Sequence, residues 1–98
     1  MREELLSAQK TIEDNAYNLW KGNGADIGVL EKTLIEVSNV IIGIAETLDE
    51  NDKVTTINFI RNALSDFERA YNSRDDYMLA DCLMFEWREI VIIYVDKN

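Results

Sequence analysis

The chain has 98 residues, among them 10 Lys and Arg and 19 Asp and Glu, which give a formal net charge of -9. This length suits one compact domain, residues 1–98, and is too short for two. Hydrophobic residues make up 47% of the chain and proline is absent, which excludes collagen-like, low-complexity and intrinsically disordered classes. The acidic excess disfavours direct binding to nucleic acid or to an anionic membrane surface.

Histidine is absent from the sequence and Cys82 is its only cysteine. A disulfide framework, a Cys/His zinc site and a His-based catalytic triad are therefore excluded within one chain. The neighbours of Cys82 are acidic or apolar and would raise its pKa, so we expect a structural thiol. We expect no metal, no cofactor and no enzymatic activity. The sequence contains no secretory signal and no apolar run of membrane-spanning length, so we expect a soluble, cytoplasmic protein.

Apolar residues recur at steps of three and four, which predicts helices almost throughout the chain. The first helix is expected from about Glu3 to Lys21, and Gly22 and Gly24 suit its C-terminal end. The second is expected from about Ile27 to Leu48, with Asp26 as its N-cap. The apolar stripes of these two helices are Leu5, Ala8, Ile12, Ala16 and Leu19, and Leu30, Leu34, Val37, Ile41, Ile44 and Leu48.

A third helix is expected to start near Lys53, with Asp52 as a candidate cap. A fourth is expected from Asp75 to about Val95, after a candidate capping box formed by Ser73 and Asp76. The β-branched run at residues 90–95 also suits a strand, but the chain offers no second strand to pair with it. The predicted stripe of the third helix is Ile57, Ile60, Leu64, Phe67 and Tyr71.

The predicted connections are only about four to five residues long, which favours antiparallel neighbours. The expected fold is all-α: an antiparallel up-down four-helix bundle. Gly43 lies in the middle of the second helix and suggests close approach by another helix. The residues expected in the core include Val37, Ile41, Leu64, Leu83 and Trp87.

The fourth helix has more apolar residues than one face can bury. On a helical wheel its core face is covered by Leu79, Ala80, Leu83, Met84, Trp87, Ile90, Val91 and Tyr94. The opposite side carries Met78, Phe85 and Ile92 at steps of seven, with Cys82 and Ile93 beside them, interleaved with Asp81, Glu86, Arg88 and Glu89. A weaker stripe, Ile35 and Ile42, lies on the back of the second helix. Apolar residues rimmed by charges are typical of a protein–protein contact. The alternative is a fourth helix that is simply buried on all sides in the bundle centre.

The segment at residues 76–86, DYMLADCLMFE, resembles a D-Y-x-L-A-D-x-L-x-aromatic-E signature of small, functionally uncharacterised bacterial helical proteins, some of which are linked to motility genes. A proline often follows the glutamate in those proteins, whereas Trp87, Arg88 and Glu89 follow it here. The resemblance implies a bacterial cytosolic protein and no known activity.

The leading hypothesis is a non-enzymatic protein-interaction module: an adaptor, small chaperone or regulator. The expected binding residues are Met78, Asp81, Phe85, Arg88, Ile92, Ile35 and Ile42. A homodimer is expected, in which Arg88 of one copy meets an acidic residue of the other. The alternative is an acidic nucleic-acid mimic that inhibits a DNA- or RNA-binding protein. Mimicry needs a continuous carboxylate face, whereas the acidic residues here are spread over predicted helix starts and helix backs.

Overall fold

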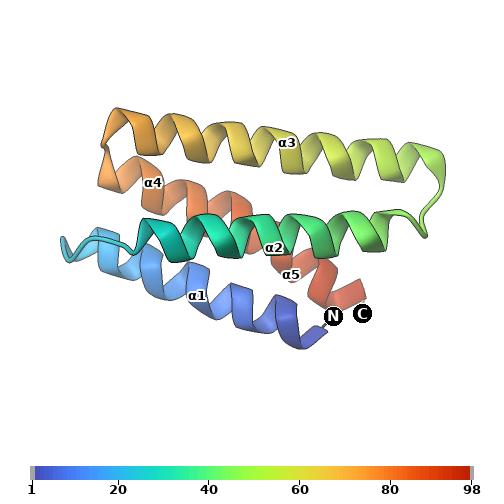
Figure 1. The fold of residues 1–98 in the computed structure, drawn as a ribbon, viewed down its shortest axis with the longest axis horizontal. Coiled ribbons are helices and arrows are strands. Elements are labelled where there is room, and N and C mark those ends of the chain that lie inside the picture. Colours follow the sequence, from blue (N-terminus) through green and yellow to red (C-terminus); the bar gives the residue numbers. More distant parts are fainter. Residues whose placement is uncertain (1, 98) are drawn as a thin grey trace.

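The computed structural model describes residues 2–97, which form an all-α four-helix bundle (Figure 1). The first three helices are α1 (Arg2–Trp20), α2 (Ile27–Ala45) and α3 (Glu50–Ser73). The fourth is one continuous helical segment, which we call the C-terminal helix. It consists of α4 (Asp76–Cys82), the π-helix η1 (Leu83–Trp87) and α5 (Arg88–Lys97). The predicted bundle is confirmed, and the β-branched run at residues 90–95 is helical.

Successive helices run antiparallel (Figure 1). α1 packs against α2 and against the whole C-terminal helix, whereas α3 packs against α2, α4 and η1. α2 therefore lies diagonally across the bundle from the C-terminal helix. Beyond η1 the chain leans towards α1 (Figure 1), and the Arg2 Nη1 atom donates to the Val95 carbonyl oxygen at 3.0 Å.

The start of α2 is the predicted one, because the Asp26 carboxylate accepts the Val29 backbone N–H at 3.1 Å. The predicted start of α3 is wrong by three residues. Its cap is Asp49, which accepts the N–H of Asp52 at 2.9 Å, so the helix begins at Glu50. Asp49 takes this role because its backbone is extended and its side chain can reach the exposed N–H groups of the first turn.

The predicted capping box before α4 is also absent. Asp75 is the cap, and its carboxylate accepts the Met78 N–H at 3.0 Å. The Ser73 hydroxyl instead donates to the Ala70 carbonyl oxygen at 2.9 Å, which satisfies the end of the preceding helix. The first turn of the C-terminal helix is thus fixed by Asp75 and places Met78 at its surface.

The glycines have two different roles. Gly22 and Gly24 follow α1 with φ of 80° and 78°, a region that L side chains rarely adopt, so they form the turn as predicted. Gly43 is exposed in α2, and no atom outside its own helical turn lies within 4 Å of the place where a Cβ would stand. The prediction that another helix approaches closely at Gly43 is therefore wrong.

Trp87 is fully buried at the centre of the bundle, and its indole N–H donates to the Ala63 carbonyl oxygen at 3.2 Å. Ala63 therefore contacts the C-terminal helix, and Ala70, two turns further along α3, is buried on the same face. The buried face of α3 is rotated from the predicted stripe, and Ile57 is half-buried. Leu64 is half-buried rather than buried, and Tyr71 is exposed. The stripes of α1 and α2 are buried as predicted, except for the half-buried Leu48.

Candidate functional site

Three of the predicted binding residues lie together on the outward side of the C-terminal helix. The side chains of Phe85 and Met78 are 64% and 39% exposed, and Asp81 is exposed between them. The buried side of the same helix is already complete, since Leu83 and Trp87 have no exposed surface. The outward position of Phe85 is therefore not required by the core.

The π-helix changes which residue continues this line. The backbone N–H of Arg88 donates to the Leu83 carbonyl oxygen, five residues back instead of four, so this turn holds one extra residue. Downstream side chains are rotated about the helix axis relative to a regular helix. Ile92 is therefore half-buried, whereas Ile93 is 50% exposed. Met78 and Phe85, which are seven residues apart, are both exposed as predicted. The next exposed position along this side of the helix is occupied by Ile93 and not by Ile92.

Arg88 faces α1 and is paired within the chain. Its Nε atom lies 2.8 Å from Glu13 Oε2, and its Nη1 atom lies 3.5 Å from Glu89 Oε1. The hydrogen bond that Arg88 donates to the Glu13 carboxylate raises the pKa of the guanidinium above its ordinary value. The structure thus places Arg88 beside the outward line of the helix, in contact with α1.

An aromatic cluster that was not predicted supports Phe85 from the side of α1. The ring centroids of Trp20 and Phe85 are 6.4 Å apart, and those of Tyr17 and Trp20 are 5.8 Å apart in an edge-to-face arrangement. Such ring pairs favour fixed orientations. Tyr17 and Trp20 are three residues apart and share a helix face, but the sequence did not show which helix they approach.

On its other side, Phe85 borders a hollow of about 380 Å³ between α3 and the first half of the C-terminal helix. Asp66 and Arg69 of α3 line it, and Arg69 Nη1 lies 3.4 Å from Asp66 Oδ1. The opposite wall consists of Met78, Asp81, Cys82, Phe85 and Glu86. We call Met78, Asp81, Phe85 and this hollow the Phe85 surface.

Two groups in this hollow hold their protons more tightly than usual. Burial raises the pKa of Glu86 to about 7, and a hydrogen bond with the Asp66 carboxyl adds to the effect. Burial also raises the pKa of the Cys82 thiol to about 12, assisted by the charge of Glu86. The predicted rise in the pKa of Cys82 is thus found, and it keeps the buried side chain as a thiol and not as the nucleophilic thiolate.

A second hollow, of about 200 Å³, lies between α3 and α5. The Thr56 Oγ1 and Tyr94 OH atoms are 2.6 Å apart and both residues are buried. Phe59 of α3 and Ile93 of α5 line this hollow, and Phe59 is 61% exposed. The sequence offered one signal for Phe59: it is a large aromatic residue outside the predicted stripe of its helix.

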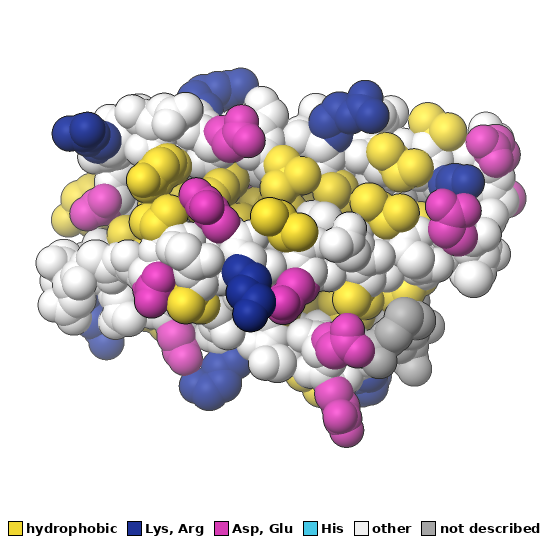
Figure 2. All heavy atoms as spheres, viewed as in Figure 1, with side chains coloured by type: hydrophobic (Ala, Val, Ile, Leu, Met, Phe, Trp, Pro, Cys, Tyr) yellow, Lys and Arg dark blue, Asp and Glu magenta, His cyan; other side chains and the backbone are white. Residues whose placement is uncertain are grey.

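Ile35 and Ile42 lie on a different face. A hollow of about 390 Å³ between α2 and α3 is lined by Ile35, Leu64 and Phe67. Ile35 is 57% exposed and Ile42 is half-buried. Figure 2 shows a band of hydrophobic side chains between α2 and α3 on this side of the molecule. Because α2 is diagonal to the C-terminal helix, the two predicted stripes do not form one binding surface.

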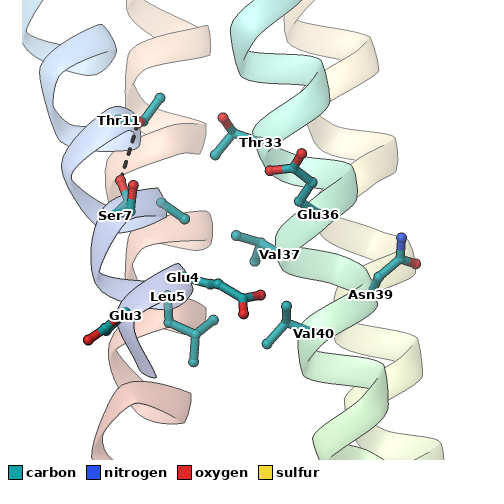
Figure 3. A pocket seen from close by; sticks show the side chains of 11 residues that line it. Glu3, Glu4, Leu5, Ser7, Thr11, Thr33, Glu36, Val37, Asn39 and Val40 are labelled. Atoms are coloured by element: carbon teal, nitrogen blue, oxygen red, sulfur yellow. Dashed lines mark hydrogen bonds between the residues drawn. The ribbon is translucent and has the colours of Figure 1, made fainter. Parts of the chain in front are cut away.

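A further hollow, of about 540 Å³, lies between α1 and α2 (Figure 3). Glu4 extends from α1 towards α2, where Val37 and Val40 face it. The Thr11 hydroxyl donates to the Ser7 carbonyl oxygen of its own helix at 3.2 Å. Within residues 2–97, no group of three or more His, Cys, Asp or Glu side chains is placed to hold a metal ion.

We place the candidate site at the Phe85 surface, because two large apolar side chains, Phe85 and Met78, are exposed there side by side with Asp81.

Comparisons with protein-family models, curated proteins and solved structures find no match. In the part of the chain that the structure describes, every helix is too short or too polar to span a membrane.

Proposed function

We propose that this protein is a non-enzymatic protein-binding module, an adaptor, small chaperone or regulator, and that it binds its partner through the Phe85 surface. The observation that carries the proposal is the 64% exposure of Phe85 on a helix whose opposite side is fully packed. Covering an exposed apolar surface contributes about 25 cal/mol per Å². Aromatic residues and methionine are enriched in protein interfaces, and both occur here within a polar rim.

The sequence resemblance coincides with this surface. Two specified positions of the signature, Asp81 and Phe85, lie on this surface, whereas Met78 stands at an unspecified position. The signature therefore contains exposed residues that packing alone does not require. On this basis we also propose a bacterial, cytoplasmic protein.

The binding partner is better explained as a different protein than as a second copy. The expected homodimer used Arg88 to meet an acidic residue across the interface, but Arg88 is already paired with Glu13 at 2.8 Å. Two copies of the Phe85 surface would instead bring the exposed Asp81 of each copy close to carboxylates of the other. Like charges placed opposite one another disfavour association.

The substitution Phe85→Asp tests this proposal. It should abolish retention of the natural partner from an extract of the source organism, because a carboxylate cannot replace an aromatic ring that the partner covers. It should leave the helical circular-dichroism spectrum unchanged, because Phe85 lies outside the core. Leu6→Asp is the matched control, since Leu6 is exposed on α1 and lies outside this surface. Retention that is insensitive to Phe85→Asp, or a variant that unfolds, would contradict the proposal.

A further inference from the structure

Two hollows follow one another along the side of the C-terminal helix that faces α3. Met78 and Phe85 line the first hollow, and Phe59 and Ile93 line the second. Phe85 and Ile93 are eight residues apart, which corresponds to about 12 Å along a helix. We call the two hollows together the α3 groove. It offers two exposed apolar sites about two helical turns apart.

The charged side chains that line the α3 groove are mainly acidic. Asp66, Asp81 and Glu86 line the first hollow and Asp52 lines the second, whereas Arg69 is the one cation among the described residues that line either. Arg69 lies 3.4 Å from Asp66, so both are already engaged. Because the pKa of Glu86 is raised to about 7, the exposed carboxylates open to a ligand are Asp81 in the first hollow and Asp52 in the second. A ligand that spans both hollows therefore meets a carboxylate in each.

The dimensions of the groove suit a helix as the occupant. A groove between two packed helices accepts the apolar face of a third, with side chains at i, i+3, i+4 and i+7 as anchors. Residues at i and i+7 of such a helix are about 10.5 Å apart, close to the separation of the two apolar sites. The polar flanks of that helix would lie against the carboxylates of the rim.

We propose that the α3 groove binds a basic amphipathic helix of another protein. This inference rests on the proposed function and specifies the chemistry of the partner. The apolar face of the partner helix contacts Phe85 and Met78 at one end and Phe59 and Ile93 at the other. Its Lys and Arg side chains pair with the exposed carboxylates of Asp81 and Asp52. A second copy of this chain is disfavoured by the same carboxylates.

The experiment uses three synthetic amphipathic peptides of about 18 residues, titrated into the intact protein by calorimetry. The first has leucines on one face and lysines on the flanks. The second has the same leucines with glutamates in place of the lysines, and the third has the composition of the first in scrambled order. We expect the first peptide to bind at least about tenfold more tightly than the other two. This preference should fall with added salt, because it depends on charge pairing.

Two single variants show whether the peptide occupies the groove. Phe59→Ala and Phe85→Ala should each weaken binding of the basic peptide at least about tenfold, because each removes one apolar site. Val54→Ala is the control, since Val54 is exposed on α3 outside both hollows. Equal binding of the scrambled peptide, or binding that is insensitive to Phe59 and Phe85, would overturn the inference.

The remaining outcomes separate this inference from the proposed function. Equal binding of the acidic peptide would overturn the basic character of the partner but leave a helix-binding groove. A Phe85-dependent dimer in analytical ultracentrifugation would identify a second copy as the occupant and overturn the inference. If no peptide binds while Phe85→Asp still abolishes retention of the natural partner, the inference fails and the proposed function stands.

Discussion

Glu86 is the residue whose surroundings differ most from those of an ordinary surface carboxylate. It lies half-buried in the π-helix and faces Asp66 and Arg69 of α3 as well as Cys82 of its own helix. Burial and the hydrogen bond with Asp66 raise its pKa from 4.5 to about 7. Between these two pH values the folded protein holds a proton that the unfolded chain releases. The free energy of unfolding should therefore fall as the pH rises from about 4.5 through about 7.

Glu86→Gln should remove this loss of stability. A neutral amide keeps a hydrogen-bond donor towards Asp66 without the cost of ionisation. We expect the variant to be more stable than the wild type by about 1 kcal/mol at pH values above about 7.5, after allowing for solvent screening of this partly exposed site, and nearly equal to it near pH 4.5. Urea unfolding at both pH values measures the difference.

Asp81→Asn on the same helix is the matched control for that experiment, because Asp81 is exposed. It should not reproduce the pH dependence of Glu86→Gln. An equal gain in stability from Asp81→Asn would show that the cause is the general acidity of the protein and not the environment of Glu86.

At the scale of the helices, most of the fold is predictable because periodicity is a local signal. The stripes of α1 and α2 include no misplaced residue apart from Leu48, since their apolar residues recur at steps of three and four without a break. The rotation of α3 was not predictable, because it depends on contacts with another helix, where the Ala63 carbonyl oxygen accepts the Trp87 N–H and Thr56 bonds to Tyr94. Two caps were missed because several acidic residues stand close together at each helix start, and sequence spacing does not distinguish them.

Part of the candidate site was also predictable, because helical periodicity is a local signal. Met78 and Asp81 lie before the π-helix η1 and Phe85 lies within it, so regular helical spacing still relates these three residues. The exchange of Ile92 for Ile93 was not predictable, since the segment at residues 83–87 contains no glycine or proline to mark the π-helix. Phe59 and the aromatic pair Tyr17 and Trp20 belong to other helices, and only the packing of the bundle brings them beside the C-terminal helix.

Gly43 provides a test at the scale of α2. Gly43→Ala should stabilise the protein by about 1 kcal/mol, because alanine restricts the unfolded backbone and favours the helix. The structure has room for the added methyl group. Urea unfolding measures the change, and Gly24→Ala is the control. That substitution should be destabilising because Gly24 has a φ of 78°. A loss of stability in Gly43→Ala would mean that another chain contacts this position.

For the whole molecule, the dominant electrostatic property is the excess of 19 acidic over 10 basic residues. The bundle confines these charges to dimensions of 42 × 25 × 19 Å. Ion pairs such as Lys53–Glu46 at 3.0 Å and Lys10–Asp14 at 2.9 Å neutralise some of the excess, but they lie at the surface and contribute little each. Repulsion among the remaining carboxylates therefore opposes folding.

Added salt should consequently raise stability. Increasing sodium chloride from about 0.01 M to about 0.15 M shortens the screening length from about 30 Å to about 8 Å, which is smaller than any dimension of the bundle. We expect the urea midpoint at pH values near 8 to increase with salt, by an amount corresponding to roughly 1 kcal/mol. Sucrose at equal osmolality is the control for non-ionic solvent effects. A midpoint that falls with salt would show that attractive ion pairs outweigh the repulsion.

The π-helix η1 at residues 83–87 contains one extra residue, which determines how the C-terminal helix would respond to a deletion. A deletion of one residue there would remove the extra residue and let the helix close as a regular α-helix, with Ile93 then 14 residues, or two heptads, after Met78. The downstream side chains would keep their orientation, so Ile93 would still face Phe59 and the hydrogen bond between Thr56 and Tyr94 would be kept. The same deletion in α4 would instead turn Asp75 and Met78 by about 100° relative to the rest of the helix. In a related chain that is one residue shorter within this turn, the residue equivalent to Ile93 would therefore still line the groove.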